Sequence, residues 1–345
     1  MSAQVKKIAT KVGTESQILA VGVYRPKRLV PNADIVDRIE SSDEWIQQRT
    51  GIESRRFADD SEQLLDMAVW AAEDALKNAK MKIEDIDTVI VATITFPFQA
   101  PSAATALLQR LGHPKAAAFD INAACAGFCY GVSMAHDFVK AGTSKNVLVI
   151  GAEKISDFTD PNDRATAFIF ADGAGAVVIG PSVEAGIGPV EWGSDADNRD
   201  AILMNPSWID VRDNETQLTK ADVRWPNISQ EGQKVFRWAV FSMSKAALKA
   251  LESAGLTVND IDAFIPHQAN VRIIETMAKE MDMPSNVIIA DDIRMNGNTS
   301  AASIPLAMDA LLKQHPELHG KLALIIGYGA GLVYAGQVVK LPPKL

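Results

Sequence analysis

The sequence predicts an α/β protein made of two similar halves, each a mostly parallel β-sheet covered by helices. Three observations indicate this class. The 345 residues are 47% hydrophobic and 22% charged, which suits a folded globular protein and argues against a disordered or membrane-embedded chain. Strand-length apolar segments alternate with alanine-rich segments of helical periodicity, a pattern typical of parallel sheets with helical connections. The third observation is an internal repeat, in which the same order of segments occurs twice.

The repeat is clearest between residues 71–90 and 246–265, which both read as a helix, a turn and a strand. Nine positions are identical between them at an offset of 175. Chance similarity of two alanine-rich helices would explain this block alone, but three more blocks follow in the same order. At an offset of 176, Asn122 matches Asn298, and residues 148–151 match residues 324–327. At an offset of 156, residues 173–175 match residues 329–331.

Each half is therefore predicted to be a β-α-β-α-β-β unit, the first at residues 1–184 and the second at residues 185–345. The change of offset implies about 20 extra residues in the first half. Residues 185–232 have no obvious counterpart and are rich in Asp, Asn and Trp, so we expect a loop or cap beside a binding site. Two halves packed face to face would bring equivalent helix N-termini to a shared interface.

Charge and cysteine content exclude several classes of protein. The net charge of −9 argues against nucleic acid as the main partner, while a local basic patch for an acidic partner stays open. Two cysteines are too few for a disulfide scaffold, and with five scattered histidines no four-ligand zinc site is expected. Residues 1–17 lack the apolar core of a signal peptide, and no segment approaches the ~20 apolar residues of a membrane span. We therefore expect a cytoplasmic protein with reduced thiols, without metal or membrane association.

Cys125 is the candidate nucleophile. It lies in the segment NAACAGF, residues 122–128, between a predicted strand at 116–121 and a predicted helix at about 127–140. The N–H groups and dipole of a helix N-terminus favour a thiolate there, which would lower the pKa of the thiol. A buried, unreactive cysteine explains the position equally well. Cys129, one turn further along the helix, is expected to be a packing residue.

His267 and Asn298 occupy similar turns. His267 lies in the segment FIPHQAN, residues 264–270, between a predicted strand and a predicted helix at about 271–281. Asn298 lies in NGNTSAAS, residues 296–303, and the repeat places it opposite Asn122. A single histidine is more often a packing or surface residue. A His, an Asn and a Cys on equivalent turns of a duplicated fold favour a shared site instead.

These motifs resemble those of β-ketoacyl-acyl carrier protein synthase III, a family of the thiolase superfamily. The resemblance extends in order from residue 18 to residue 341 and also involves residues 41–51, 163–164 and 170–175. It implies a thiolase-like fold, in which the two halves form a layered α-β-α-β-α sandwich, and a homodimer. It also implies an acyltransferase that initiates type II fatty acid synthesis and needs no cofactor.

The mechanism implied by the resemblance has two half-reactions. Cys125 would take an acyl group from a coenzyme A thioester. Malonyl-acyl carrier protein would then lose carbon dioxide while His267 and Asn298 donate hydrogen bonds to its thioester oxygen, and the carbanion would attack the acylated Cys125 to give a 3-ketoacyl product. The backbone N–H groups of Cys125 and Ala330 would form the oxyanion hole, although the family more often has glycine where Ala330 stands.

The resemblance further implies residues that bind coenzyme A. Trp45 and Arg49 are i,i+4 neighbours on a helix that is predicted to begin with a capping box at residues 41–44. Together with Arg164 they would hold the nucleotide, with stacking and cation–π contacts to its adenine. A purely structural Trp–Arg stack is the alternative.

Two more sets of residues follow from the resemblance. Arg237, Arg272 and Lys279 would meet the acidic acyl carrier protein, or else form a solvated face, and Glu280 stands where a second basic residue is often found. The acyl pocket would include Ala100, Phe170 and Tyr328. A small residue at position 100, in a loop expected to reach across a dimer, leaves room for a longer or branched primer.

Other functions remain as alternatives. A nucleotide-binding oxidoreductase would use residues 327–331, GYGAG, as a dinucleotide loop, but the residues that follow are β-like. A serine hydrolase is disfavoured because the sequence has no G-x-S-x-G elbow. A thiolase would need a second catalytic cysteine in residues 327–336, and an elongating synthase a histidine in place of Asn298. A related Cys-His-Asn condensing enzyme of polyketide-like metabolism and a catalytically silent scaffold remain possible.

Overall fold

The computed structural model describes residues 11–214 and 225–344 of the chain, and it contains two five-stranded sheets. The first sheet has the strand order β1-β7-β6-β4-β5 and the second the order β12-β11-β13-β14-β8. The first consists of β1 (Glu15–Tyr24), β4 (Thr88–Ala92), β5 (Ala117–Ile121), β6 (Val147–Lys154) and β7 (Asp172–Ser182). The second consists of β8 (Glu191–Ser194), β11 (Ala263–Pro266), β12 (Ile288–Ile289), β13 (Leu322–Gly329) and β14 (Val333–Lys340).

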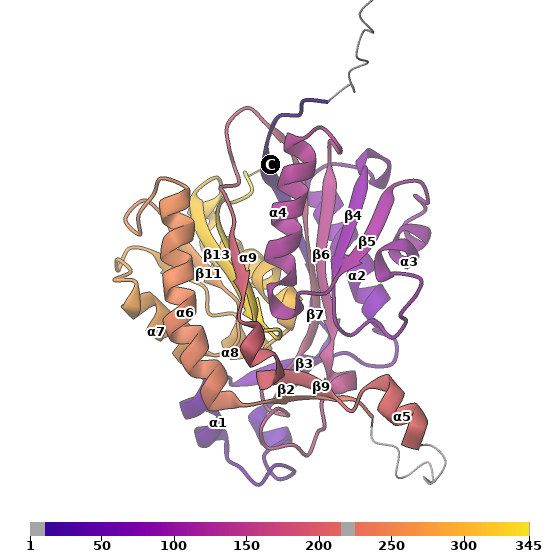
Figure 1. Ribbon diagram of the computed structural model, residues 1–345, viewed down its shortest axis with the longest axis vertical. Coiled ribbons are helices and arrows are strands. Elements are labelled where there is room, and N and C mark those ends of the chain that lie inside the picture. Colours follow the sequence, from indigo (N-terminus) through magenta and orange to yellow (C-terminus); the bar gives the residue numbers. More distant parts are fainter. Residues whose placement is uncertain (1–10, 215–224, 345) are drawn as a thin grey trace, which may run out of the picture.

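Helices cover both faces of each sheet, so that five layers alternate (Figure 1). The two central helices pack between the sheets, and one pair of helices covers each outer face. The central pair is α4 (Gly127–Lys140) and α9 (Ser303–Gln314), and the outer pairs are α2 (Leu64–Asn78) with α3 (Ala103–Arg110) and α6 (Gly232–Ser253) with α7 (Val271–Glu280). Among the described helices, none combines the length and apolarity needed to cross a membrane. The predicted layered α/β sandwich is confirmed.

The two sheets have the same topology, with β1, β7, β6, β4 and β5 matching β8, β14, β13, β11 and β12. Each half therefore follows the order β-α-β-α-β-α-β-β, with one strand and one helix more than the predicted unit. The two-residue strand β12 is too short to give an alternating pattern in the sequence. The four-residue strand β8, the counterpart of β1, lies inside the segment 185–232 that was expected to be loop or cap.

The strand register corrects the last block of the predicted repeat. Val147 pairs with Ile179 in the first half, and Ala323 pairs with Val339 in the second. Val147 and Ala323 are 176 residues apart, whereas their partners are 160 apart, so the first half has 16 extra residues and not about 20. Residues 173–175 therefore do not match residues 329–331. A short run of Gly and Ala aligns at several offsets, and only the hydrogen-bond register selects one of them.

Smaller elements lie between the first strand and first long helix of each half. In the first half they are β2 (Arg28–Pro31), α1 (Asp43–Thr50) and β3 (Ser54–Phe57), and in the second β9 (Ile202–Asn205), α5 (Trp208–Asn214) and β10 (Asn227–Gln230). The predicted capping box at the start of α1 is wrong, because Ser42, not Ser41, caps this helix. The Ser42 hydroxyl accepts a hydrogen bond from the Trp45 N–H at 3.1 Å.

The halves touch through two matching turns, η3 (Ala124–Ala126) before α4 and η7 (Ser300–Ala302) before α9. Each turn rests on a glycine of the other half's central strand. A Cβ on Gly151 of β6 would lie 2.2 Å from the carbonyl oxygen of Ala301, and a Cβ on Gly327 of β13 would lie 2.9 Å from the Cα of Ala126. Glycine is therefore required on both strands for this close approach.

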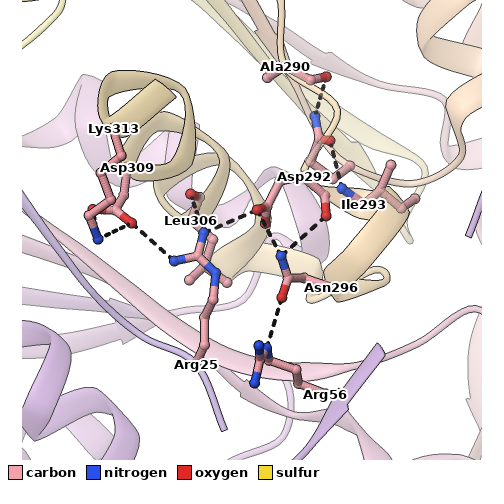
Figure 2. A network of polar contacts seen from close by, with 10 residues as sticks. Arg25, Arg56, Ala290, Asp292, Ile293, Asn296, Leu306, Asp309 and Lys313 are labelled. Carbon is pink, nitrogen blue, oxygen red and sulfur yellow. Dashed lines mark hydrogen bonds and ion pairs between the residues drawn. The ribbon is translucent and has the colours of Figure 1, made fainter. Parts of the chain in front are cut away.

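A second junction consists of ion pairs and hydrogen bonds between the halves (Figure 2). The Arg25 guanidinium, just after β1, lies 3.2 Å from Asp292 and 3.0 Å from Asp309, and donates to the Leu306 carbonyl at 2.8 Å. Arg56 of β3 donates to the side-chain oxygen of Asn296 at 3.0 Å, and the Asn296 amide donates to Asp292 at 2.9 Å. These contacts fasten the first half to α9 and to α8 (Ile293–Asn296) of the second.

Replacing Arg25 by methionine is expected to lower the free energy of unfolding by about 3–5 kcal/mol, because Asp292 would stay buried without its cation. The Asp292 side chain is only 9% exposed. Urea unfolding near neutral pH measures the change. Arg199→Met is the matched control, since the Arg199–Asp200 pair has side chains 76% and 69% exposed and should contribute less than about 1 kcal/mol. Equal losses in the two variants would contradict this role of Arg25.

Candidate active site

The two turns that join the halves carry the chemical groups of the site. Cys125 lies in η3, between the carboxyl end of β5 and α4, and Asn298 lies two residues before η7, which leads into α9. Ala124 and Ser300 occupy matching positions, with left-handed φ values of 44° and 50°. The duplication therefore repeats an unusual backbone conformation on both sides of the junction.

A cavity of about 630 Å³ opens at this junction and brings most of the predicted residues together. Cys125, His267 and Asn298 all line it, with Cys125 half-buried and His267 and Asn298 only 2% and 5% exposed. Apolar side chains form much of the remaining wall, including Ile94, Ile155, Ile202, Leu203, Met204, Phe170 and Ile228. An apolar cavity with a few convergent polar groups is typical of a small-molecule site.

His267 follows β11 and is held by a hydroxyl on α9. Its Nδ1 lies 2.7 Å from the Ser303 Oγ, and that oxygen also accepts the N–H of Gln268 at 3.3 Å. Ser303 satisfies both contacts when its own hydrogen is donated to Nδ1, which leaves the proton of a neutral imidazole on Nε2. Burial lowers the pKa of His267 from 6.5 to about 3, so the ring is neutral near pH 7.

Asn298 is fixed by its backbone and by its own side chain. Its N–H donates to the Ile169 carbonyl at 2.9 Å and its carbonyl accepts the Ala171 N–H at 2.8 Å. The side-chain Oδ1 accepts the Ser300 N–H at 2.8 Å. The amide therefore keeps its Nδ2 hydrogens for the cavity that Asn298 lines. His267 with Nε2–H and Asn298 with its Nδ2 amide are therefore both fixed hydrogen-bond donors.

The low thiol pKa expected for Cys125 is wrong for the substrate-free chain. Burial raises the pKa of the Cys125 thiol to about 12, and the negative charge of Glu153 raises it further, while a hydrogen bond with Ser300 lowers it. Desolvation of the sulfur is the largest cause, and the helix itself begins only at Gly127, two residues after the cysteine. Cys129 is fully buried, as expected for a packing residue.

The predicted backbone donors lie beside the nucleophile. Cys125 and Ala330 both line the cavity. Ala330, in the turn between β13 and β14, has no positive φ, so an alanine is accommodated there without strain, and Gly331 takes the φ of +134°.

Two arginines lie over the ring of Trp45 of α1 in the cavity wall. The guanidinium carbons of Arg49 and Arg164 lie 5.6 Å and 5.3 Å from the centre of its ring, and Phe168 packs edge-on at 5.4 Å. All four residues line the cavity. Arg164 and Phe168 belong to the extra segment between β6 and β7, so this insertion builds part of the wall.

Two of the three predicted basic residues lie at the same cavity. Arg237 of α6 and Arg272 of α7 are exposed cavity-lining residues, and the Arg272 guanidinium lies 5.5 Å from the centre of the Phe236 ring. Lys279 is exposed at the far end of α7 and does not line the cavity.

Two of the three predicted acyl-pocket residues also line the cavity, and one does not. Phe170 and Tyr328 line the cavity, and the Tyr328 ring packs against His267 at 5.2 Å. The buried Tyr328 hydroxyl has no hydrogen-bond partner among the described residues, and burial raises its pKa. Ala100 lies on an exposed loop outside the cavity, so a single chain does not bring it to the site.

Sequence reasoning missed three polar residues of the site. Ser300 and Ser303 were part of the quoted segment 296–303 but received no role. Glu153 is a buried carboxyl at the end of β6, and burial raises its pKa to about 7. A charged residue at the end of an apolar strand was a usable signal. Among the described residues, no three His, Cys, Asp or Glu side chains gather into a metal-binding group.

Comparisons with known proteins agree with this site. The profile described as 3-oxoacyl-[acyl-carrier-protein (ACP)] synthase III matches residues 119–196, and that of its C-terminal part matches residues 251–341. The β-ketoacyl-[acyl-carrier-protein] synthase III of Kocuria rhizophila is 51% identical over 343 residues, which cover 95% of this chain and 97% of that protein.

Solved structures agree with the fold as well. The priming β-ketosynthase of the R1128 polyketide pathway is 42% identical, with a TM-score of 0.94 over 99% of this chain and 100% of that one. The 3-oxoacyl-[acyl-carrier-protein] synthase III of Aquifex aeolicus is 36% identical, with a TM-score of 0.86 over 94% of this chain and 99% of that one.

The lowered pKa of His267 predicts how the stability of the protein depends on pH. Between pH 6.5 and about 3 the unfolded chain binds a proton that folded His267 excludes, so stability is present above pH 6.5 and is lost as the pH falls. In His267→Asn this contribution is absent. The free-energy difference between wild type and variant should fall by up to about 1.4 kcal/mol per pH unit below pH 6.5. Denaturant unfolding at several pH values measures it, and a constant difference would contradict the buried neutral imidazole.

Proposed function

Because this chain belongs to the β-ketoacyl-[acyl-carrier-protein] synthase III family, we propose that Cys125, His267 and Asn298 perform the two half-reactions of its activity. The chain is an acyltransferase, the initiating condensing enzyme of fatty acid synthesis. It transfers an acyl group from acyl-coenzyme A to a cysteine and condenses it with malonyl-acyl carrier protein.

In the first half-reaction the Cys125 sulfur attacks the acyl-coenzyme A thioester and forms an acyl-enzyme. The oxygen of the tetrahedral intermediate carries negative charge and needs donors that are already in position. The N–H groups of Cys125 and Ala330 supply them, which is supported by the presence of both residues on the cavity wall.

In the second half-reaction His267 and Asn298 stabilise the enolate that forms as malonyl-acyl carrier protein loses carbon dioxide. The observation that carries this proposal is the fixed direction of two buried donors, Nε2–H of His267 through Ser303 and Nδ2–H of Asn298 through the Ser300 N–H. Both side chains are neutral near pH 7, so they stabilise the developing negative charge without protonating the carbanion, which would end the reaction. Each such donor is worth about 3–4 kcal/mol in the transition state.

Coenzyme A is proposed to bind at the mouth of the cavity against Trp45, Arg49 and Arg164. The two guanidinium groups provide positive charge for phosphates, and the indole provides a face for adenine. Both arginines already lie against Trp45, so an adenine stacks there only if one of them moves away.

The acyl carrier protein is proposed to dock beside the cavity on Arg237, Arg272 and Lys279. These exposed cations would attract an acidic partner despite the net charge of −9, since association depends on the local potential. Arg237 and Arg272 line the cavity, so a partner bound to them would lie next to it. Lys279 extends this basic surface along α7.

A homodimer is the proposed assembly. β5 is an edge strand in the described sheet, and four of its five residues are only half-buried. The adjacent loop exposes Phe98 by 63% and also exposes Ala100. Pairing of two copies at this edge would cover both features and carry the Ala100 loop toward the partner's cavity. We propose a cytoplasmic location, since both cysteines are free thiols.

Priming of polyketide synthesis is the second candidate. It is supported by the likeness to the R1128 priming β-ketosynthase and requires the same two half-reactions. The two candidate functions, initiation of fatty acid synthesis and priming of polyketide synthesis, would differ in which acyl group the apolar cavity accepts.

Cys125→Ala is expected to form no acyl-enzyme with acetyl-coenzyme A, as seen by intact-protein mass spectrometry. His267→Ala and Asn298→Ala should still be acylated but lose at least about 10²-fold in condensation, because each lacks one donor to the enolate. Cys129→Ala is the matched control and should acylate like the wild type. A stable acyl-enzyme in Cys125→Ala would refute the nucleophile.

Arg272→Glu is expected to raise the KM for malonyl-acyl carrier protein about tenfold or more, with little change in acylation by acetyl-coenzyme A, because it reverses the charge met by the acidic partner. Lys145→Glu is the control, an exposed lysine before the amino end of β6 and so at the opposite edge of the sheet. An unchanged KM in Arg272→Glu would overturn the docking surface.

A further inference from the structure

Glu153 is a buried carboxyl for which the proposed mechanism has no use. It stands at the carboxyl end of β6, is 0% exposed, and lies close enough to Cys125 to raise the pKa of that thiol. An isolated buried carboxylate is costly, so a carboxyl in this place calls for a physical explanation.

The surroundings of Glu153 are built to accept a carboxylate. Its Oε2 lies 2.5 Å from the Thr95 hydroxyl and 3.1 Å from the Thr93 hydroxyl, and the Ile94 N–H donates to it at 3.2 Å. The two threonine oxygens already accept backbone N–H groups, Thr95 from Lys154 at 3.0 Å and Thr93 from Thr95 at 3.2 Å. Their hydrogens are therefore free to be donated to Glu153, and three donors hold one oxygen.

The other carboxyl oxygen leads to the nucleophile. The Ser300 hydroxyl donates to Glu153 Oε1 at 3.2 Å, and the same side chain lies beside the Cys125 thiol and influences its pKa. Ser300 is fully buried and lines the cavity, and its left-handed φ of 50° belongs to the turn where the halves meet. Ser300 thus lies between Cys125 and Glu153, and with its hydrogen on Glu153 its oxygen is left to accept the thiol proton.

We propose that Glu153 is the base that receives the thiol proton of Cys125, through Ser300, as the sulfur attacks. This inference rests on Cys125 being the nucleophile of the proposed function. Glu153 would then act in the first half-reaction, as the proton acceptor reached through Ser300. His267 would act only in the second half-reaction, the condensation.

The proton path balances in acyl transfer. As the new S–C bond forms, the Cys125 proton passes to the Ser300 oxygen, and the Ser300 proton passes to Glu153 Oε1. The coenzyme A sulfur then leaves with the electron pair of its bond to the acyl carbon. The proton returns from Glu153 through Ser300 to that sulfur, so free coenzyme A thiol and the Cys125 thioester are formed and the relay is reset.

The acid–base properties of the neighbouring groups agree with this direction of transfer. Burial raises the pKa of Glu153 to about 7, whereas burial lowers that of His267 to about 3. A base whose pKa lies near the working pH is the more effective one, so the thiol proton goes to Glu153.

Other charged groups on the elements around β6 are engaged elsewhere. Lys154, the next residue, donates to the Asp59 carbonyl at 3.1 Å, and Asp172 of β7 accepts from Ser156 and from the Ala58 N–H. On the helices packed against the sheet, Asp74 of α2 accepts the Val23 N–H, and His136 of α4 bonds to Ser16. Within the described ranges, Cys125 is the titratable side chain joined to Glu153 through Ser300.

The alkylation rate of Cys125 by iodoacetamide, followed by mass spectrometry across the neutral pH range, tests the relay without any acyl substrate. In the wild type the rate should rise as Glu153 ionises, with a midpoint near pH 7. Glu153→Gln should lose this midpoint and react about 10²-fold more slowly at neutral pH. Ser300→Ala should lose both in the same way, and Glu153→Asp, which keeps a carboxylate, should retain a titration.

A charge effect alone predicts the opposite sign. The charge of Glu153 raises the pKa of Cys125, so a variant that only removes this charge makes the thiol more acidic and faster. Faster or unchanged alkylation in Glu153→Gln or Ser300→Ala would overturn the relay, even where Cys125→Ala confirms the nucleophile. Asp172→Asn, which removes another buried carboxyl with a raised pKa, is the control and should keep the wild-type profile. Thermal unfolding checks that each variant is folded. If Glu153→Gln does not fold, the pH midpoint in Ser300→Ala decides, because loss of the contact with Cys125 alone would slow alkylation but leave a midpoint near pH 7.

Discussion

The active site depends on one steric constraint, the contact of each half's turn with a glycine of the other half. Gly151 receives η7, and Gly327, 176 residues later, receives η3. A side chain at either position would push the turns apart. This contact fixes the relative position of Cys125 and Asn298, which belong to different halves but to matching turns. The Arg25 and Arg56 contacts join the two halves at a second junction, around Asp292 and Asn296.

Burial at this junction determines the protonation states of His267, Cys125 and Glu153. Removal from water favours the neutral form of every ionisable group, so it lowers the pKa of His267 and raises those of Cys125 and Glu153. The result is a neutral hydrogen-bond donor, a protonated nucleophile and a carboxyl that titrates near neutrality. In the proposed mechanism the thiol therefore needs a base, and the neutral imidazole is left to stabilise negative charge. The serines of the η7–α9 segment connect the three groups, Ser303 to His267 and Ser300 to Cys125 and Glu153.

At the rim of the cavity, surface contacts and not burial determine how the charged groups interact. Trp45, Arg49, Arg164, Arg237 and Arg272 lie at or near the surface, where single contacts are weak and several must act together. Much of this rim comes from segments outside the duplicated unit: α1 from the segment after β1, and Arg164 with Phe168 from the insertion between β6 and β7. The duplicated core carries Cys125, His267 and Asn298 and, on α6 and α7, the basic residues of the proposed docking surface, whereas α1 and the insertion carry the residues of the proposed coenzyme A site.

The sequence by itself determined the α/β class, the duplication and the positions of Cys125, His267 and Asn298, because periodicity, repeat offsets and strand-to-helix turns are local patterns. It also identified the family. It did not determine strand register, where Gly and Ala runs align at several offsets, or the short strands β8 and β12, which have too few residues to show a pattern. The Ser42 cap likewise depends on one hydrogen bond. Only the tertiary structure decided the protonation of the site, since desolvation depends on what the fold packs around a group. For the same reason only the structure connected Glu153 to Cys125, two residues whose link through Ser300 spans both halves of the chain.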